Sequence, residues 1–391
     1  MIFDVSQRTD ASPMRNAETG FGFLNRSARP EIGVVREFLE VCLSGYPSEE
    51  VPELVSRLRS GNDGQFDSAT FEIILHAGLT KLGYTLIPHP PLPNGCTSRP
   101  DFLVRTPDGQ QLYLEAVLAS EKTEKKPAGE ALIGLAVDAI AKASHRDFFV
   151  ALESRGYPQT QPSGKKLLRD TLAWLDTLSV DEIARIAEQS GLDACPSYTW
   201  RHEEWELTIR PVPISPERRG TSSTLLGILS GGASWVDAFS PLRNAIKRKG
   251  SKYGTLDAPL LIAVNVQSFD LDPIDEKQAL FGQEQVVFSR KDPDMTPRFQ
   301  RAPNGVWIGP KGPQYKRISG VWFFNDLNPY TVASRRQTIY WNPWTAHPLP
   351  ESLLVFPHFK AAEAKAQRVD GIEFRQIFDL PEGWPEDAGP Q

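Results

Sequence analysis

Two adjoining stretches constrain this chain most: Asp101–Arg105 (DFLVR) and Gln111–Ala119 (QLYLEAVLA), both rich in residues that favour β-strands. Between them lies TPDG, in which proline pre-sets φ and glycine accepts a positive φ, as a hairpin turn requires. With the turn centred on Asp108, Leu103 lies opposite Tyr113 and Arg105 opposite Gln111. Asp101 then lies opposite Glu115, with Cβ atoms about 5 Å apart on one face of the sheet.

Two carboxylates in directly opposed positions repel each other and destabilise a sheet. Both are flanked by apolar residues, a pattern typical of strands that are buried on both faces. The pair is tolerated when a cation lies between the two groups, and Mg²⁺ (or Mn²⁺) is the natural candidate because it takes oxygen ligands. The alternative is that both side chains are solvated on an exposed face, and the flanking residues favour burial.

Hydrophobic periodicity predicts α-helices and β-strands in alternation along most of the chain. The helix around 67–82 carries Glu72 at the edge of its apolar stripe, so that Glu72 can lean towards the sheet. We expect helices at 31–44, 49–60, 67–82, 131–143, 164–177, 180–190 and 240–253, and strands at 84–87, 101–105, 111–119, 148–153, 205–212 and 260–266.

The same reading predicts three regions. Residues 1–65 form a loose arm (1–30) followed by helices. Residues 66–267 form a core, made of 66–119 and 240–267, with a helical insertion at 120–239. Residues 268–391 form a β-rich C-terminal region, in which NGVWIGP and RISGVWFF are expected to pair as strands.

The stretch 66–119 resembles the PD-(D/E)XK nuclease superfamily, which has the restriction-endonuclease-like fold. The family pattern is a helix with a glutamate, a strand, a strand opening with Pro-Asp, a strand carrying (D/E)-x-K, then a helix and a further strand. Here Glu72 stands for the helical glutamate, Pro100-Asp101 for the Pro-Asp step and Glu115 for the acid of the last motif. The resemblance implies an α/β fold with a mixed sheet flanked by helices, and a metal site made of Glu72, Asp101 and Glu115.

The chain departs from the family at position 117, where valine replaces the motif lysine that normally orients the attacking water and stabilises developing charge. Either the site is inactive and the fold serves binding, or another residue supplies the cation. Lys249 is the first candidate, because it lies on the otherwise apolar stripe of the helix 240–253. Lys252 shares much of that face, and Lys122 is a weaker alternative. Against this, both helical lysines can simply reach solvent.

The helix 240–253 also contains the densest basic cluster of the chain, with Arg243, Lys247 and Arg248 beside the two lysines. Such a cluster can contact the phosphates of a nucleic acid, although a charge run is usually a solvated helix face.

Composition bounds the remaining possibilities. The net charge of −6 argues against a protein that coats nucleic acid by bulk charge, but it leaves room for local basic patches. There is no run of eighteen apolar residues and no secretory signal at the start, so we expect no membrane partner. The three cysteines form no zinc spacing, and a cytoplasmic location is the simplest expectation. No phosphate-binding glycine motif is present.

Together these features predict a metal-dependent endonuclease that hydrolyses phosphodiester bonds, with DNA as the expected substrate and a role in bacterial defence or DNA processing implied by the resemblance alone. Asp101 and Glu115 bind Mg²⁺, Glu72 binds it or positions the water, and a helical lysine offsets charge at the phosphate. The first rival is a catalytically inactive member that binds nucleic acid or protein. The second rival is an unrelated α/β scaffold with no nucleic-acid role, and the test that separates it is whether the three acids converge within metal-bridging reach.

Overall fold

The computed structural model describes residues 1–119, 126–222, 224–230, 239–267, 271–287, 298–362 and 365–387 of the 391-residue chain. The chain divides into two compact units. Unit 1 comprises Met1–Ala11, Thr19–Glu121 and Val236–Gln391, and unit 2 comprises Ser12–Glu18 and Lys122–Trp235. Within the described ranges, no helix is both long enough and apolar enough to span a membrane.

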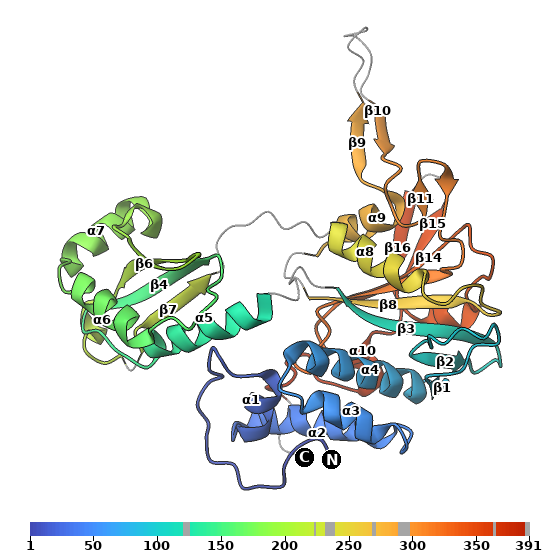
Figure 1. The fold of residues 1–391 in the computed structure, drawn as a ribbon, viewed down its shortest axis with the longest axis horizontal. Coiled ribbons are helices and arrows are strands. Elements are labelled where there is room, and N and C mark those ends of the chain that lie inside the picture. The colour runs from blue at the N-terminus through green and yellow to red at the C-terminus, as the bar shows by residue number, and fades with distance from the viewer. Residues whose placement is uncertain are drawn as a thin grey trace. The chain divides into compact units, whose positions relative to one another are not determined.

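Unit 1 is built on an eight-stranded mixed sheet with the strand order β1-β2-β3-β8-β13-β14-β15-β16 (Figure 1). The first three strands form an antiparallel meander, and β3, β8 and β13 run parallel to one another. Strand β8 (LLIAVNV) is buried along its whole length, as a central parallel strand should be. The strand bounds are β1 Thr85–Pro88, β2 Phe102–Arg105, β3 Gln111–Ala119, β8 Leu260–Val266, β13 Gly320–Asn325, β14 Gln337–Trp341, β15 His358–Ala362 and β16 Lys365–Val369.

Helices cover both faces of this sheet, and each face has its own apolar core. In Figure 1 the N-terminal helices and α10 lie on one side of β3 and β8, and α8 and α9 lie on the other. Two short ribbons, β9–β10 and β11–β12, pair outside the main sheet. The bounds are α1 Gly20–Arg26, α2 Pro30–Ser44, α3 Val51–Leu58, α4 Asp63–Lys81, α8 Phe239–Gly250, α9 Pro273–Phe281, α10 Phe374–Phe378, β9 Glu284–Val287, β10 Arg298–Arg301, β11 Ile308–Gly309 and β12 Gly312–Pro313, with a 3-10 turn at Glu351–Val355.

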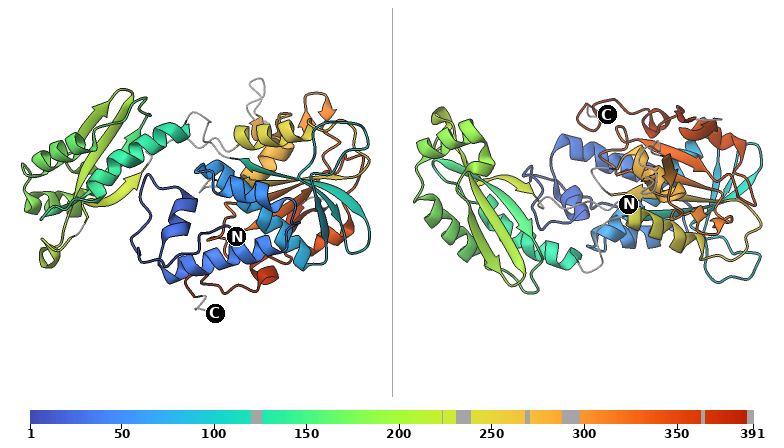
Figure 2. Two further views of the ribbon diagram at one scale, coloured as in Figure 1. Left: turned by 60° about the horizontal axis from the view of Figure 1, so that its bottom comes forward. Right: turned by 90° about the horizontal axis from the view of Figure 1, so that it is seen from above.

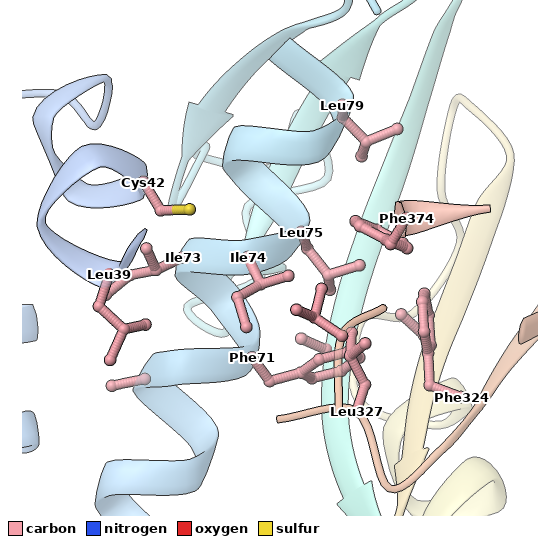
Figure 3. Packing of buried hydrophobic residues seen from close by; sticks show 14 of the residues in the cluster. Leu39, Cys42, Phe71, Ile73, Ile74, Leu75, Leu79, Phe324, Leu327 and Phe374 are labelled. Carbon is pink, nitrogen blue, oxygen red and sulfur yellow. The ribbon is translucent and has the colours of Figure 1, made fainter. Parts of the chain in front are cut away.

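The central helix of the first core is α4, which is buried on nearly all sides. Its N-terminus is capped by Asn62, whose side-chain oxygen accepts from the backbone N–H of Gln65 (3.0 Å). Figure 3 shows Ile73 pointing towards the helix that carries Leu39 and Cys42, while other α4 side chains point towards the sheet and Phe374. A helix packed on both sides has no clear polar face. The amphipathic stripe expected from the sequence is therefore only half of what α4 buries.

Unit 2 is an α/β unit with a four-stranded sheet in the order β5-β6-β4-β7, and in both views of Figure 2 its helices (green) pack beside its strands. Side chains from one face of β4, β5 and β6 share a single core with the three helices. The bounds are α5 Lys126–Ala141, β4 Phe148–Arg155, α6 Gly164–Leu175, α7 Val180–Ser190, β5 Tyr198–His202, β6 Trp205–Pro213 and β7 Leu226–Ser230, with 3-10 turns at Leu192–Ala194 and Pro216–Arg218.

The prediction of a mixed α/β chain with a large mixed sheet flanked by helices is confirmed. The bounds predicted for β3 and β8 agree with the structure, because strongly periodic or continuously apolar runs mark strands well. The insertion is not mainly helical, because it contains its own four-stranded sheet, to which the strands predicted at 148–153 and 205–212 belong. The β-rich C-terminal region contributes β13 to β16, which extend the main sheet.

Two further predictions are wrong. Residues 1–30 are not a loose arm, since they include α1 and contribute Ile2, Phe3, Phe23 and Leu24 to the first core. The segments NGVWIGP and RISGVWFF do not pair with each other, because β13 lies between β8 and β14 and the short β11 pairs with β12. The core partners of the N-terminal residues and the β8 partner of β13 are distant in sequence, so local periodicity carries no signal for them. Strand β11 instead turns back on its immediate neighbour β12.

Candidate active site

The hairpin of β2 and β3 has the register expected from its turn. Leu103 pairs with Tyr113 and Arg105 with Gln111, and the register continued by one residue brings Asp101 opposite Glu115. The two acids are in contact, because the backbone N–H of Asp101 donates to Glu115 Oε2 (3.3 Å). Asp101 Oδ2 in turn accepts from the backbone N–H of Ala116 (2.7 Å). The hairpin therefore holds each carboxylate against the backbone of the opposite strand at the start of β2.

Strand alternation determines which helix Glu115 meets. Its neighbours on the same face, Tyr113 and Val117, belong to the core that packs under α8, whereas Leu114 and Ala116 belong to the opposite core. Glu115 is fully buried. A buried carboxylate is tolerated only with hydrogen-bond or ion-pair partners, and these come from α8 and the turn that follows it.

Lys249 and Tyr253 supply these partners. The Lys249 ammonium forms a salt bridge with Glu115 Oε1, and the Tyr253 hydroxyl donates to Glu115 Oε2. The four-residue spacing places the two side chains on one side of this segment. Burial, reinforced by the negative charge of Glu115, raises the pKa of the Tyr253 hydroxyl, which therefore remains a donor at neutral pH. Lys249 thus occupies the apolar stripe without an unpaired charge.

Of the acids at the site, Asp101 has the fewest cations and hydrogen-bond donors to offset its negative charge. Its pKa is raised to about 7, first by burial and then by the negative charges of Glu115 and Glu72, against the lowering influence of Lys249 and the Ala116 N–H. No described residue donates a hydrogen bond to Asp101 Oδ1. The protein's own groups therefore leave a surplus of negative charge at this position.

Glu72 has a different environment. It is buried on α4, and Arg57 of α3 binds it with both terminal nitrogens, at 2.9 Å to Oε2 and 2.5 Å to Oε1. Arg57 also donates to the hydroxyl of Ser68 (3.2 Å). The negative charge of Glu72 helps to raise the pKa of Asp101, but no hydrogen bond joins Glu72 to Asp101 or to Glu115.

The predicted three-acid metal set is therefore not assembled as expected. Throughout the described ranges, no group of three His, Cys, Asp or Glu side chains is arranged to hold a metal ion. The physical reason is the bidentate ion pair with Arg57, which holds the Glu72 carboxylate. What the structure brings together is the smaller set of Asp101, Glu115, Lys249 and Tyr253.

The other basic residues of α8 and of the turn that follows it make different contacts or are exposed. The Lys252 ammonium lies over the Tyr253 ring at 5.3 Å, and no ion pair joins it to an acid of the site. Arg243 donates to the backbone oxygen of Asn304 (3.1 Å), and Lys247 lies 5.5 Å from the centre of the Tyr315 ring. Arg248 is exposed. The weaker lysine candidate, Lys122, lies outside the described residues.

Sequence reasoning missed two residues of this region. Tyr253 lies at the end of the helix predicted over 240–253, and its four-residue spacing from Lys249 is a usable signal for a shared partner. Arg57 had no such signal, because its contact with Glu72 depends on how α3 packs against α4.

Comparisons with known proteins do not assign the chain to a family. A scan against protein-family models, a search of curated proteins and a search of solved structures each return no match.

Proposed function

We propose that the chain is a metal-dependent nuclease in which Lys249 replaces the motif lysine that is absent at position 117. The observation that carries the proposal is the contact of the Lys249 ammonium with Glu115, directly beside Asp101. Val117 lies on the same face of β3 as Glu115, so a lysine there and a lysine from α8 would deliver their cations to one place.

The order of elements supports the same proposal. In sequence order, α4, β1, β2, β3, α8 and β8 correspond to the helix, three strands, helix and strand of the restriction-endonuclease-like core. The three strands form a meander, and β3 pairs in parallel with β8. Helix α8 packs on both β3 and β8, as the second helix of that core would.

The acids present suit one hard divalent cation. Mg²⁺ is commonly bound by one or two carboxylates and keeps several of its waters. Asp101 and Glu115 are the two carboxylates that would hold it here, and the raised pKa of Asp101 marks a position where added positive charge is favourable. The bound ion would act as a Lewis acid on the phosphate and would lower the pKa of a bound water.

The chain's own residues have separate roles in this proposal. Lys249 offsets negative charge that develops at the scissile phosphate, and Tyr253 fixes the orientation of Glu115. Glu72, held by Arg57, contributes negative potential that keeps the site attractive to a cation. Arg248 and Lys252, both exposed on or just after α8, can hold neighbouring phosphates of DNA.

The test is cleavage of supercoiled plasmid DNA by the full-length protein with Mg²⁺ or Mn²⁺ and with a chelator. Wild-type protein is expected to nick or cut only with metal. Asp101→Asn and Lys249→Met are expected to lower the rate by about 100-fold or more, the effect of removing one group that stabilises transition-state charge. Lys165→Met, at an exposed lysine of α6 in unit 2, is the control and should stay within about threefold.

A second candidate, a nucleic-acid-binding protein without catalysis, is favoured by one observation. Both oxygens of Glu115 already have protein partners, and no three-acid metal group is present in the part of the chain that the structure describes. Plasmid binding that persists in the chelator, with no cleavage by preparations verified as folded, would favour this candidate over the nuclease.

A further inference from the structure

A second site lies on unit 1, away from the acids. It is a cavity of about 730 Å³ beside α9, β14 and β15, within the range of about 300–1,000 Å³ typical of small-molecule sites. Four aromatic residues of the second core contribute to its lining: Phe281, Tyr340, Trp344 and Phe359. The rings of Tyr340 and Phe359 are stacked, with centroids 5.1 Å apart. Flat aromatic walls of this kind fit a planar ring.

The lining of the cavity also includes His358. Its Nδ1 atom lies 2.9 Å from the carbonyl oxygen of Phe356, and because a carbonyl only accepts, Nδ1 carries the proton. The Nε2 atom of this buried ring is then a hydrogen-bond acceptor in the neutral form. A nucleobase edge that carries a hydrogen-bond donor matches this acceptor.

Two cations and no acid are among the residues that line the cavity. The Lys277 ammonium lies 4.6 Å from the centre of the Phe359 ring, and Arg301 is held by Glu284 (2.7 Å) and by the carbonyl of Gly282 (2.9 Å). Positive charge beside stacked aromatic rings is the combination with which proteins bind a nucleobase and its phosphate.

Sheet register relates this cavity to the candidate active site. Glu115 pairs with Ile262, Ile262 with Val321, and Val321 with Tyr340, so one row of residues crosses four adjacent strands. Three strand spacings amount to about 14 Å, or about four base steps of a B-form strand. Glu115 faces the core to which Ile262, Val321 and Tyr340 belong, so the cavity and the acids lie on one face of the sheet.

We propose that the aromatic cavity binds a nucleobase, with Lys277 and Arg301 beside its phosphate. The base can belong to a free nucleotide or to a nucleic-acid strand engaged at the acids. Only the second source rests on the proposed nuclease function.

The first experiment uses the full-length protein without metal, so that no cleavage takes place. The probes are the four deoxynucleoside monophosphates, the matching nucleosides, deoxyribose 5-phosphate and octanoate, titrated by calorimetry. Nucleotides are expected to bind and to outcompete the other probes. Deoxyribose 5-phosphate or octanoate binding as tightly as the nucleotides would overturn the proposal, and so would the absence of nucleotide binding at millimolar concentration.

Variants then locate the binding. Trp344→Ala is expected to weaken nucleotide binding between about 5-fold and 150-fold, the effect of losing one stacked aromatic side chain. Trp344→Phe, which keeps a ring, should stay within a few-fold of wild type. Trp174→Ala, which removes a tryptophan of unit 2, should leave binding unchanged. Lys277→Gln should weaken the binding of nucleotides by at least about threefold while leaving the binding of nucleosides unaffected.

The source of the base is separated with an oligonucleotide that carries 2-aminopurine. Quenching of its fluorescence in wild-type protein, lost in Trp344→Ala, assigns the base to a strand, whereas binding of free nucleotides alone assigns the site to nucleotides. If the protein binds bases but never cuts plasmid, the nucleobase site is supported and the nuclease function is not. If it cuts plasmid while Trp344→Ala changes neither binding nor quenching, the nuclease function is supported and the nucleobase site is not.

Discussion

The ion pair between Lys249 and Glu115 permits the sharpest test of the site. Lys249→Met keeps an unbranched side chain of similar length but removes the ammonium, which leaves the fully buried Glu115 with only the Tyr253 hydroxyl and one backbone N–H. Removing one partner of a buried pair costs about 3–5 kcal/mol. Because 21 % of the Lys249 side chain is exposed, water screens part of the interaction, and we expect the lower end, about 3 kcal/mol.

The assay is thermal unfolding followed by circular dichroism at pH 8. A loss of about 3 kcal/mol corresponds to a fall in Tm of roughly 6–12 °C for a unit of this size. Lys252→Met is the matched control and should change the free energy of unfolding by less than about 0.5 kcal/mol. Glu115→Gln completes a double-mutant cycle with an expected coupling of about 2 kcal/mol. Equal effects of the two lysine substitutions, or purely additive single variants, would refute the reasoning.

Three more predictions concern residues around the site. Because the folded-state pKa of Asp101 lies near 7, above its ordinary 3.8, the folded protein binds the extra proton between about pH 4 and 7. The stability that this proton provides is therefore lost as pH rises through 7. Asp101→Asn should raise the free energy of unfolding at pH 8 by on the order of 3 kcal/mol, and its urea midpoint should vary less with pH. Arg57→Ala should lower the free energy of unfolding by about 3–5 kcal/mol, because Glu72 would be buried without its cation. Arg57→Lys should lose less of this stability, and urea unfolding measures both variants. Gly78→Ala should cost about 1–3 kcal/mol in the same assay, because its Cβ would lie 2.4 Å from the Phe374 ring.

The charge balance at the acids links these outcomes to function. One lysine offsets the charge of two neighbouring acids, and a third carboxylate on α4 adds negative potential. A divalent cation bound at Asp101 would remove the penalty that raises the pKa of this group. Mg²⁺ should therefore raise the Tm of wild-type protein more at pH 8 than at pH 5, and should not raise that of Asp101→Asn.

Local sequence determined the hairpin and the acids that it opposes. Two-residue alternation and a TPDG turn depend only on neighbouring residues, so the register of Leu103 with Tyr113 could be derived without knowledge of the fold. The placement of Lys249 on an apolar stripe likewise follows from helical periodicity. The same local signals gave β8, since a short, continuously apolar, β-branched run needs burial on both faces.

Tertiary structure decided which charges meet. Lys249 and Glu115 are 134 residues apart, and the chain forms a separate α/β unit between them before α8 packs over β3. Arg57 binds Glu72 only because α3 lies against α4, and that contact withdrew Glu72 from the predicted metal set. A buried charged side chain is stable only beside a partner whose interaction offsets the loss of its hydration. Sequence periodicity shows that a side chain is buried and needs such a partner. It does not show which residue the packing of the fold brings to it.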